Sequence, residues 1–360
     1  MIQLSKKRQN ALVGLEIEAG SIAAAEVVVN GTARLGRTAI APLPAQVFSD
    51  GEVGDPGRLA EGLRAMFAES GLPKRVRLGI ANQWTVVRTL RLPAIEDPAE
   101  LEAAVQFQAQ EQIPMPIEQA VLDHKVVGGT PGEEGAPPQV DVVVVAARRD
   151  MILSLLRPLR DAGLEPQGVD LSAFGMIRAL GANGAAVAEA GAADSAPGAT
   201  LFYQLGEMTN LAIALDRTCL FTRVSPVGLE GIATELSGAT GAPIEHARMW
   251  LTHVGLGRPL EQIEGDTEMI AKSRTAMEAG VSSLLDELRM SLDYYGAQED
   301  APRVERIVLC GPGSAIPGLP EHMQSILGIP FALGRPEALS GLDEASAARL
   351  TLPFGLALEG

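Results

Sequence analysis

Val13-Gly14-Leu15-Glu16-Ile17-Glu18-Ala19-Gly20-Ser21-Ile22-Ala23 is the stretch that decides the fold of this chain. It has the frame of a phosphate-binding hairpin, with an apolar strand, a turn at Gly20 and Ser21, and a second apolar strand. Such a hairpin needs an Asp that positions a metal ion, and then Gly and small hydroxyl residues whose N–H groups face the phosphates. Here Glu16 stands at the Asp position, and Glu18 places a second carboxylate where phosphate oxygens should approach. Because two anions repel a polyanion, we expect the ancestral phosphate chemistry to be weak or lost.

The composition is that of a large globular protein. The chain has 360 residues, of which 46% are hydrophobic and 21% charged, and this length predicts two lobes. The net charge of -16 argues against nucleic acid, which demands a basic face, and against direct attraction to anionic lipid. The start of the sequence lacks the apolar core of a secretory signal, and no apolar run approaches the roughly 20 residues that cross a bilayer. We therefore expect a cytoplasmic protein that does not insert into the membrane.

The cysteines and histidines show no pattern of a metal site or of a catalytic site. Cys219 and Cys310 each lie in an apolar run without a second cysteine nearby, which predicts two buried free thiols. The four histidines are scattered among residues that do not bind metals. No serine nucleophile turn and no cysteine–histidine arrangement is visible. The sequence predicts neither a metal site nor a catalytic residue.

The first half of the chain reads as one α/β lobe that contains a smaller inserted module. The lobe opens with three antiparallel strands, over 13–17, 22–29 and 33–40, and Asn30-Gly31 supplies a tight turn. A helix from Asp55 to Gly71 and a strand over 76–81 follow. The module has the order strand, helix, strand, strand, helix. Its expected elements are a strand over 86–92, a helix over 98–113, strands over 121–127 and 140–147, a loop over 128–138 and a helix capped by Asp150.

The second half repeats the opening theme after an Ala- and Gly-rich segment over roughly 181–198. Three short strands, over 201–205, 211–215 and 219–224, again precede helices, which suggests an internal duplication. The expected parts are a first lobe over 10–81 and 166–190, an inserted module over 82–165, a second lobe over 199–228 and 303–360, and a mostly helical module over 229–302.

Three glycine turns follow one another in the order typical of actin and the sugar kinases. They are Ala19-Gly20-Ser21, Leu205-Gly206-Glu207 and Gly311-Pro312-Gly313. More specific motifs are Leu92-Pro93, Phe107-Gln108-Ala109-Gln110-Glu111-Gln112-Ile113-Pro114-Met115-Pro116, Asp123, Phe221-Thr222-Arg223 and Ser291-Leu292-Asp293-Tyr294-Tyr295. With these motifs the whole chain resembles PilM, the actin-like family of type IV pilus assembly. The resemblance implies an α/β fold of two actin-like (ribonuclease H-like) lobes, with a small α/β module inserted in the first. We expect the chain to lack the C-terminal membrane segments of FtsA and GspL, which share the fold.

The chain departs from the family at each set of nucleotide contacts. The family's Asp before the second glycine turn is Gln204 here, Pro312 replaces a Gly of the third turn, and 247–251 lacks the Glu and Lys that face the ribose. The remnants of the cleft are Glu16, Glu18, Gly20, Ser21, Gln204, Gly206, Gly311 and Gly313. We expect no cofactor, with ATP and magnesium as the alternative.

The resemblance implies a scaffold rather than an enzyme. PilM proteins bind the short N-terminal tail of the inner-membrane protein PilN in a groove between the first lobe and its inserted module. The side chains expected to bind this tail are Arg88, Gln106, Gln110 and Glu111. Other pilus assembly proteins are further expected partners, an oligomer is possible, and the protein would reach the inner membrane through its partner. Two alternatives are an ATP-binding member whose nucleotide tunes partner binding, and a sugar-kinase-type phosphotransferase, for which no catalytic Asp is visible in the second lobe.

Overall fold

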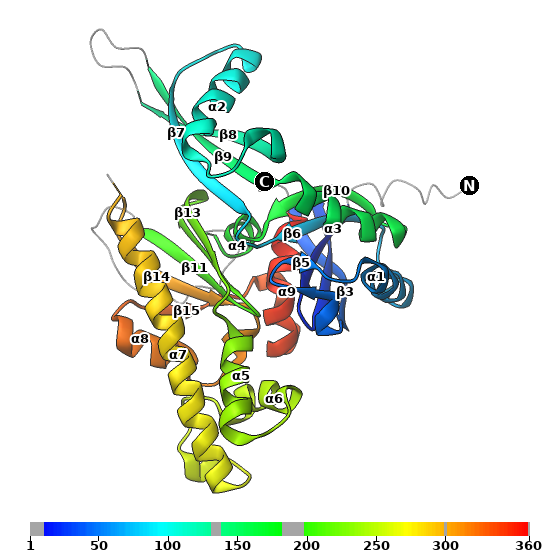
Figure 1. The fold of residues 1–360 in the computed structure, drawn as a ribbon, viewed down its shortest axis with the longest axis vertical. Coiled ribbons are helices and arrows are strands. Elements are labelled where there is room, and N and C mark those ends of the chain that lie inside the picture. Colours follow the sequence, from blue (N-terminus) through cyan, green and yellow to red (C-terminus); the bar gives the residue numbers. More distant parts are fainter. Residues whose placement is uncertain (1–10, 131–137, 182–197, 299–300, 359–360) are drawn as a thin grey trace.

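The computed structural model describes residues 11–130, 138–181, 198–298 and 301–358. Two lobes, each built on a five-stranded sheet, lie side by side, and a smaller module rises from the first lobe (Figure 1). The expected α/β class is thereby confirmed. The low-complexity residues 182–197 and the basic N-terminal residues lie outside the described part.

The first lobe has the strand order β10-β6-β1-β2-β3. β1 (Ala11–Glu18), β2 (Ser21–Asn30) and β3 (Thr32–Pro42) form an antiparallel meander, and β6 (Arg75–Ile80) and β10 (Glu165–Leu171) add to it in parallel. The two turns of the meander contain Gly20 and Gly31, with φ angles of +87° and +80°. Only glycine adopts such angles without strain, so these two residues fix where the strands reverse. The three strands expected at the start of the chain are confirmed.

Two helices cover one face of this sheet. α1 (Pro56–Ser70) begins after Asp55, whose carboxylate accepts a hydrogen bond from the Arg58 N–H, and it ends at Gly71 with φ +65°. α3 (Arg149–Asp161) lies beside α1 and buries Leu155 and Leu159 in the first-lobe core. α3 was expected to belong to the inserted module over 82–165. In the structure its apolar stripe packs on α1 and β10, so it belongs to the first lobe. The N-cap of α3 is Arg148 rather than Asp150.

The remaining module residues form an antiparallel sheet in the order β7-β9-β8, with one helix packed on it. Its elements are β7 (Thr85–Pro93), α2 (Pro98–Gln112), β8 (Ala120–Thr130) and β9 (Gln139–Arg148). Val142, Val144 and Ala146 of β9 pack in one core with side chains of α2. The intervening Val143 and Val145 belong to the opposite face, which is turned toward the lobes. Residues 128–130 continue β8, and the rest of the loop expected over 128–138 lies largely outside the described residues.

The second lobe repeats the topology of the first. Its sheet has the order β13-β12-β11-β14-β15, in which an antiparallel meander is again followed by two parallel strands. The strands are β11 (Ala199–Leu205), β12 (Thr209–Leu215), β13 (Thr218–Ser225), β14 (Val304–Cys310) and β15 (Phe331–Leu333). The helices attached to this lobe are α5 (Leu229–Thr240), α6 (Ile244–Val254), α7 (Thr267–Gly296) and α8 (Leu319–Leu327). The shared strand order agrees with an internal duplication.

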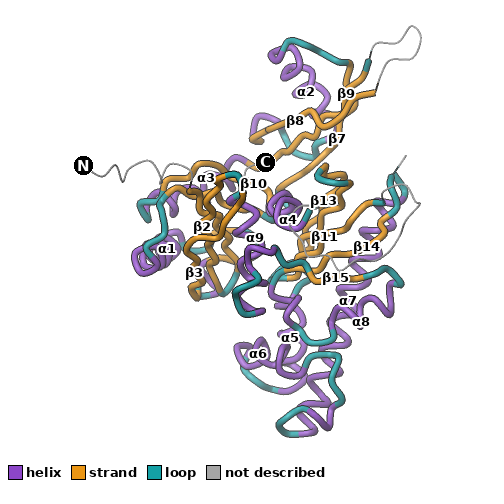
Figure 2. The backbone as a smooth tube through the Cα atoms, turned by 180° about the vertical axis from the view of Figure 1, so that it is seen from behind, coloured by secondary structure: helices purple, strands orange, loops and turns teal. Residues whose placement is uncertain are grey.

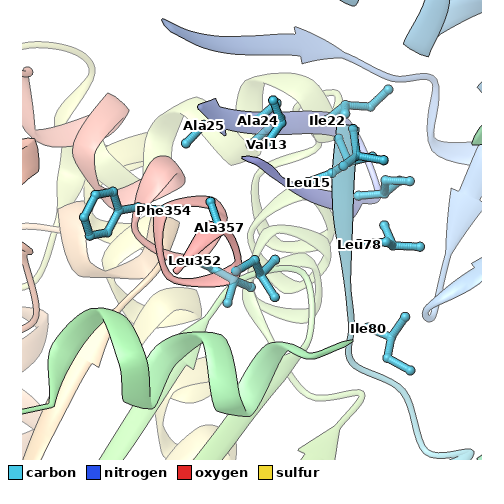
Figure 3. Close-up of a cluster of buried hydrophobic side chains, with 14 of the residues drawn as sticks. Val13, Leu15, Ile22, Ala24, Ala25, Leu78, Ile80, Leu352, Phe354 and Ala357 are labelled. Atoms are coloured by element: carbon cyan, nitrogen blue, oxygen red, sulfur yellow. The ribbon is translucent and has the colours of Figure 1, made fainter. Parts of the chain in front are cut away.

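Two helices lie between the lobes, as both views show (Figures 1 and 2). α4 (Ser172–Leu180) contacts β11 and β12, and α9 (Glu344–Ala357) packs on α4, β1 and β2. Leu352, Phe354 and Ala357 of α9 share a core with the first-lobe sheet (Figure 3). Gly14 allows this approach, because a Cβ there would collide with the Pro353 carbonyl. The C-terminal helix therefore belongs to the first lobe, whereas 303–360 was expected in the second.

Candidate functional site

The hairpin turns of the two lobes meet across the interlobe cleft. The turn from β1 to β2 contains Ala19, and the turn from β11 to β12 contains Glu207. Glu207 Oε2 accepts a hydrogen bond from the Ala19 N–H, with an N···O distance of 2.7 Å. Deeper in the cleft, Gln204 Nε2 donates to Glu16 Oε1 at 2.6 Å. These two hydrogen bonds join the lobes at the place where a phosphate-binding cleft would open.

The carboxylate of Glu18 lies between the two turns. Its Oε2 is 3.2 Å from Arg349 Nη1 of α9, and the side chains of Glu18 and Arg349 are 16% and 22% exposed. Its Oε1 lies so close to Gly206 that a Cβ on this glycine would collide with it. A side chain of the first lobe thus occupies the space directly in front of the second-lobe turn.

Burial shifts the acidity of the cleft carboxyl groups upward. It raises the pKa of Glu16 to about 8; the neighbouring Glu18 adds to this rise, and Arg349 and the hydrogen bond from Gln204 oppose it. Burial also raises the pKa of Glu18, against the charge of Arg349. At pH 7 Glu16 is therefore mostly neutral, and Arg349 pairs with Glu18.

The cleft retains only a small hollow, of about 40 Å³, lined from both lobes. Pockets that enclose a drug-sized ligand usually measure about 300–1,000 Å³, and one water needs about 10–15 Å³. Asn210 lines the hollow and is 4% exposed, and its amide finds no hydrogen-bond partner among the described residues. The hollow thus has the size and the polar lining for a few water molecules.

The other cleft residues expected from the sequence lie at the hairpin tip or behind the strands. Gly20 and Ser21 form the tip of the first-lobe hairpin, and the buried Ser21 hydroxyl has no partner in the part of the chain that the structure describes. Gly311 has φ +80°, and a Cβ on it would lie 3.0 Å from the Leu205 carbonyl oxygen. Gly313 is buried, and a Cβ there would press into the Leu205 side chain. Packing against β11 therefore explains both glycines of the third turn.

A second candidate site lies under the module, on the face of its sheet away from α2. Three adjoining hollows of about 570, 620 and 470 Å³ follow one another there, and we call them together the module groove. The first and second share Lys125, Val143, Phe174 and Arg178, and the second and third share Val127, Thr218 and Cys219. The first hollow, between the module and the first lobe, is also lined by Ile80, Val121, Asp123, Val145, Ile152 and Val169.

Apolar side chains dominate the first hollow, and charged groups border it. Arg178 forms an ion pair with Asp170 and also donates to the Gly355 carbonyl. Arg77 donates to the carbonyls of Leu356 and Leu358. Among the described residues Asp123 has no ion pair, and its Oδ1 accepts a hydrogen bond from the His124 N–H. The first hollow therefore offers an apolar surface with one exposed, unpaired carboxylate, and the exposed Lys125 lies where it joins the second hollow.

The residues expected to bind a partner lie outside this groove. Gln106, Gln110 and Glu111 are exposed on α2, beside Phe107, which is 67% exposed. Arg88 of β7 is half-buried and donates to the Val87 carbonyl. It pairs in register with Val144, which packs with α2, so it belongs to the face of the sheet opposite the groove. The structure thus groups three of the four residues on one helix and places none of them in the module groove.

Two contacts in the cleft and the lining of the groove were not predicted from the sequence. Glu207 belongs to the second predicted glycine turn, but its hydrogen bond with the Ala19 N–H was not predicted. Arg349 reaches Glu18 from the last helix, and nothing local in the sequence indicates this contact. One feature of the sequence did indicate the groove. Strand residues 142–147 are apolar at successive positions, and a strand that is apolar on both faces is covered on both.

The cysteines and the metal-binding residue types add no further candidate site in the described part of the chain. Cys219 and Cys310 are buried free thiols, as predicted, and burial raises the pKa of both. Across residues 11–130, 138–181, 198–298 and 301–358, no cluster of histidine, cysteine or carboxylate side chains suits a metal ion. Within the same ranges no helix combines the length and apolarity needed to cross a bilayer.

Comparisons with known proteins agree on the fold. A family model described as type IV pilus assembly protein PilM matches residues 14–352. The chain is similar to a solved PilM–PilN type IV pilus biogenesis complex, with 25% identity and a TM-score of 0.78 over 96% of this chain and 97% of that one. The ethanolamine utilization protein EutJ from Carboxydothermus hydrogenoformans is 14% identical, with a TM-score of 0.55 over 97% and 89% of the two chains. ADP-bound MreB5 of Spiroplasma citri is 12% identical, with a TM-score of 0.52 over 96% and 95%. The last two share the fold alone.

Proposed function

Because this chain belongs to the PilM family of type IV pilus assembly proteins, we propose that it is a scaffold that docks the N-terminal tail of a PilN-like membrane protein in the first hollow of the module groove. The solved relative is a PilM–PilN complex, which supports a PilN-like partner. Other pilus proteins are further partners in this proposal, and the protein works in the cytoplasm, held at the inner membrane by its partner.

The observation that carries the proposal is the chemistry of the first hollow. Val121, Val143, Val145 and Phe174 line about 570 Å³ of space between the module and the first lobe. Extended tails bind such grooves through apolar side chains and main-chain hydrogen bonds. Cytoplasmic segments near a membrane usually carry Lys or Arg, and the unpaired Asp123 at the edge of the hollow offers them a carboxylate.

In the same proposal the interlobe cleft is closed by the protein's own side chains, and nucleotide binding is weak or lost. Mg-ATP would need open backbone N–H groups at both hairpin turns and charged carboxylates beside the metal. Glu18 covers the Gly206 turn, and Glu207 takes the Ala19 N–H. Glu16, with its pKa near 8, is a poor partner for a cation at pH 7. The residues present therefore do not fit Mg-ATP in this arrangement.

One observation favours the alternative of an ATP-binding member. The Ser21 hydroxyl at the hairpin tip is buried and has no partner among the described residues. If Glu18 rotated away, this hydroxyl would face the opened space together with the neighbouring N–H groups. Nucleotide would then compete with the contact between Glu18 and Arg349.

Calorimetric titration with a synthetic N-terminal tail peptide of the PilN-like partner tests the proposal. We expect Val121→Asp, a change at a 39% exposed residue of the first hollow, to weaken binding about tenfold or more, because a charge would meet apolar side chains of the tail. Phe107→Asp, the same kind of change on the exposed face of α2, is the matched control and should leave the affinity unchanged.

The expected residues Arg88, Gln106, Gln110 and Glu111 define the competing docking face. If Phe107→Asp and Gln110→Ala weaken binding while Val121→Asp does not, the tail docks on α2 and the proposed groove is wrong. Circular dichroism melting of each variant shows whether the module stays folded.

A further inference from the structure

The module groove continues beyond the first lobe. Along β9, Ala147 and Val145 line the first hollow, Val143 lines the first and second, and Asp141 lines the third. These residues alternate along the strand and so share one face. From Ala147 to Asp141 the strand advances six residues, which is about 20 Å. One strand of the module thus borders the groove over its whole length.

The far end of the groove is built by the second lobe. Thr218, Cys219 and Leu220 of β13 line the third hollow together with Tyr295 of α7. β7 of the module lies beside β13 (Figure 1). Within the described residues β13 is the outermost strand of its sheet, so one edge of its backbone is not paired with another strand. A chain that follows β9 to its end therefore meets the second lobe.

Two cations face the middle of the groove from different parts of the molecule. Lys125 belongs to the module and Arg217 to the turn before β13, and both line the second hollow. Both are exposed, and neither has an ion pair with any other described residue. The third cation there, Arg178, is paired with Asp170. In a chain with a net charge of -16, this hollow offers two uncompensated positive groups.

We propose that the partner chain, once its tail is docked in the first hollow, continues along β9 into the second and third hollows. There its oxygen atoms, from main-chain carbonyls or from a carboxylate, accept hydrogen bonds from Lys125 and Arg217, and it ends against β13. This inference rests on the proposed tail docking. One bound segment then contacts the module and both lobes, so its affinity depends on how the lobes are held together. By linkage, docking stabilises the lobe arrangement that places Arg217 beside the groove.

Two peptides from the partner's N-terminus separate this inference from the docking itself. A peptide of about six residues is long enough for the first hollow, and one of about twelve reaches the second lobe, at roughly 3.3 Å per residue. We expect the longer peptide to bind about tenfold more tightly and to slow amide hydrogen exchange over residues 218–220. Arg217→Ala should remove most of this advantage and leave the shorter peptide unaffected, because one or two hydrogen bonds to a charged group account for about a tenfold change.

Arg34→Ala on β3, another exposed arginine, is the control and should change neither affinity. Replacing acidic residues of the longer peptide by their amides distinguishes a carboxylate, which would lose affinity, from main-chain carbonyls, which would not. Equal binding of both peptides, with no protection of β13, would overturn the inference and leave the proposed function intact. Failure of the shorter peptide to bind at all would overturn both.

Discussion

Glu18 Oε2 and Arg349 Nη1 lie 3.2 Å apart in front of the Gly206 turn, and this contact joins the first hairpin to the last long helix. The two residues are 331 positions apart in the chain. In the fold typical of actin, a phosphate would occupy the space between the two turns. Here the Glu18 carboxylate and the Arg349 guanidinium occupy that space and form an ion pair with each other.

We predict that Arg349→Ala destabilises the protein by about 2 kcal/mol, because it leaves the Glu18 carboxylate nearly buried without its partner. Breaking a fully buried pair costs about 3–5 kcal/mol, and both side chains here keep some exposure. Urea unfolding measures the loss. The control is Arg58→Ala, which breaks the exposed pair with Asp55 and should cost less than about 1 kcal/mol. Equal losses in the two variants would show that the pair in the cleft contributes no more to stability than an exposed pair does.

The unfolding free energy should depend on pH through the protonation of Glu16. Its pKa in the folded protein is about 8, above the ordinary value of 4.5, so the folded state holds the proton more tightly than the unfolded state. The stability from this group is fully present below pH 4.5, falls as the pH rises from about 4.5 to about 8, and is lost above that. Glu16→Gln removes the dependence.

The measurement is the difference in unfolding free energy between wild type and Glu16→Gln at several pH values. Glu18 and Glu207, whose pKa values burial also raises, are present in both proteins and largely cancel. The unfolding free energy of the variant should rise relative to that of the wild type as the pH increases from about 4.5 to about 8. A constant difference from pH 5 to 8 would mean that Glu16 is not protonated in the folded protein.

The elements that the sequence predicted are those with local signals. Asp55 and Asp97 cap α1 and α2 because a carboxylate bonds N–H groups two or three residues ahead. Gly20, Gly31 and Gly71 mark turns and a helix end because of their own φ angles. The repeat of the strand meander was visible for the same reason, since each copy is a short run of apolar strands separated by turns.

What the sequence did not predict depends on contacts between distant segments. The apolar stripe of α3 is equally compatible with packing on the module sheet and with packing on the first lobe. In the structure Leu155 and Leu159 lie in the first-lobe core. α9 follows second-lobe strands in the chain, and its return to β1 rests on the absence of a side chain at Gly14. The groove lies on the face of the module sheet opposite α2. The position of α2 does not determine how the first lobe is placed against that opposite face.

Gly206→Ala should open or strain the cleft, because the added methyl group collides with Glu18 Oε1. We expect a loss of about 1–3 kcal/mol, in the range of overpacked interiors. Glu18→Ala in the same chain should restore most of it, since it removes the group that the methyl strikes. Gly238→Ala, at an exposed helix position with open space around it, is the control and should be neutral or slightly stabilising. Additive effects of Gly206→Ala and Glu18→Ala would contradict the proposed contact.

The last prediction concerns nucleotide. Wild-type protein should bind Mg-ATP weakly, because Glu18 blocks the Gly206 turn, Glu207 takes the Ala19 N–H, and the remaining hollow measures about 40 Å³. Two like charges held about 4 Å apart cost roughly 4 kcal/mol at an effective dielectric constant of 20, which is nearly a thousandfold in affinity. Glu18→Gly with Gln204→Asp removes the blocking carboxylate and restores an acidic group beside the metal position, so its affinity for Mg-ATP should rise by at least tenfold. Isothermal calorimetry with and without magnesium measures both proteins, and Gln204→Asp alone, which leaves Glu18 in place, is the matched control. A micromolar dissociation constant for the wild type would show that Glu18 leaves the cleft readily. The proposal of a scaffold whose cleft is closed would then be wrong, and the ATP-binding alternative would take its place.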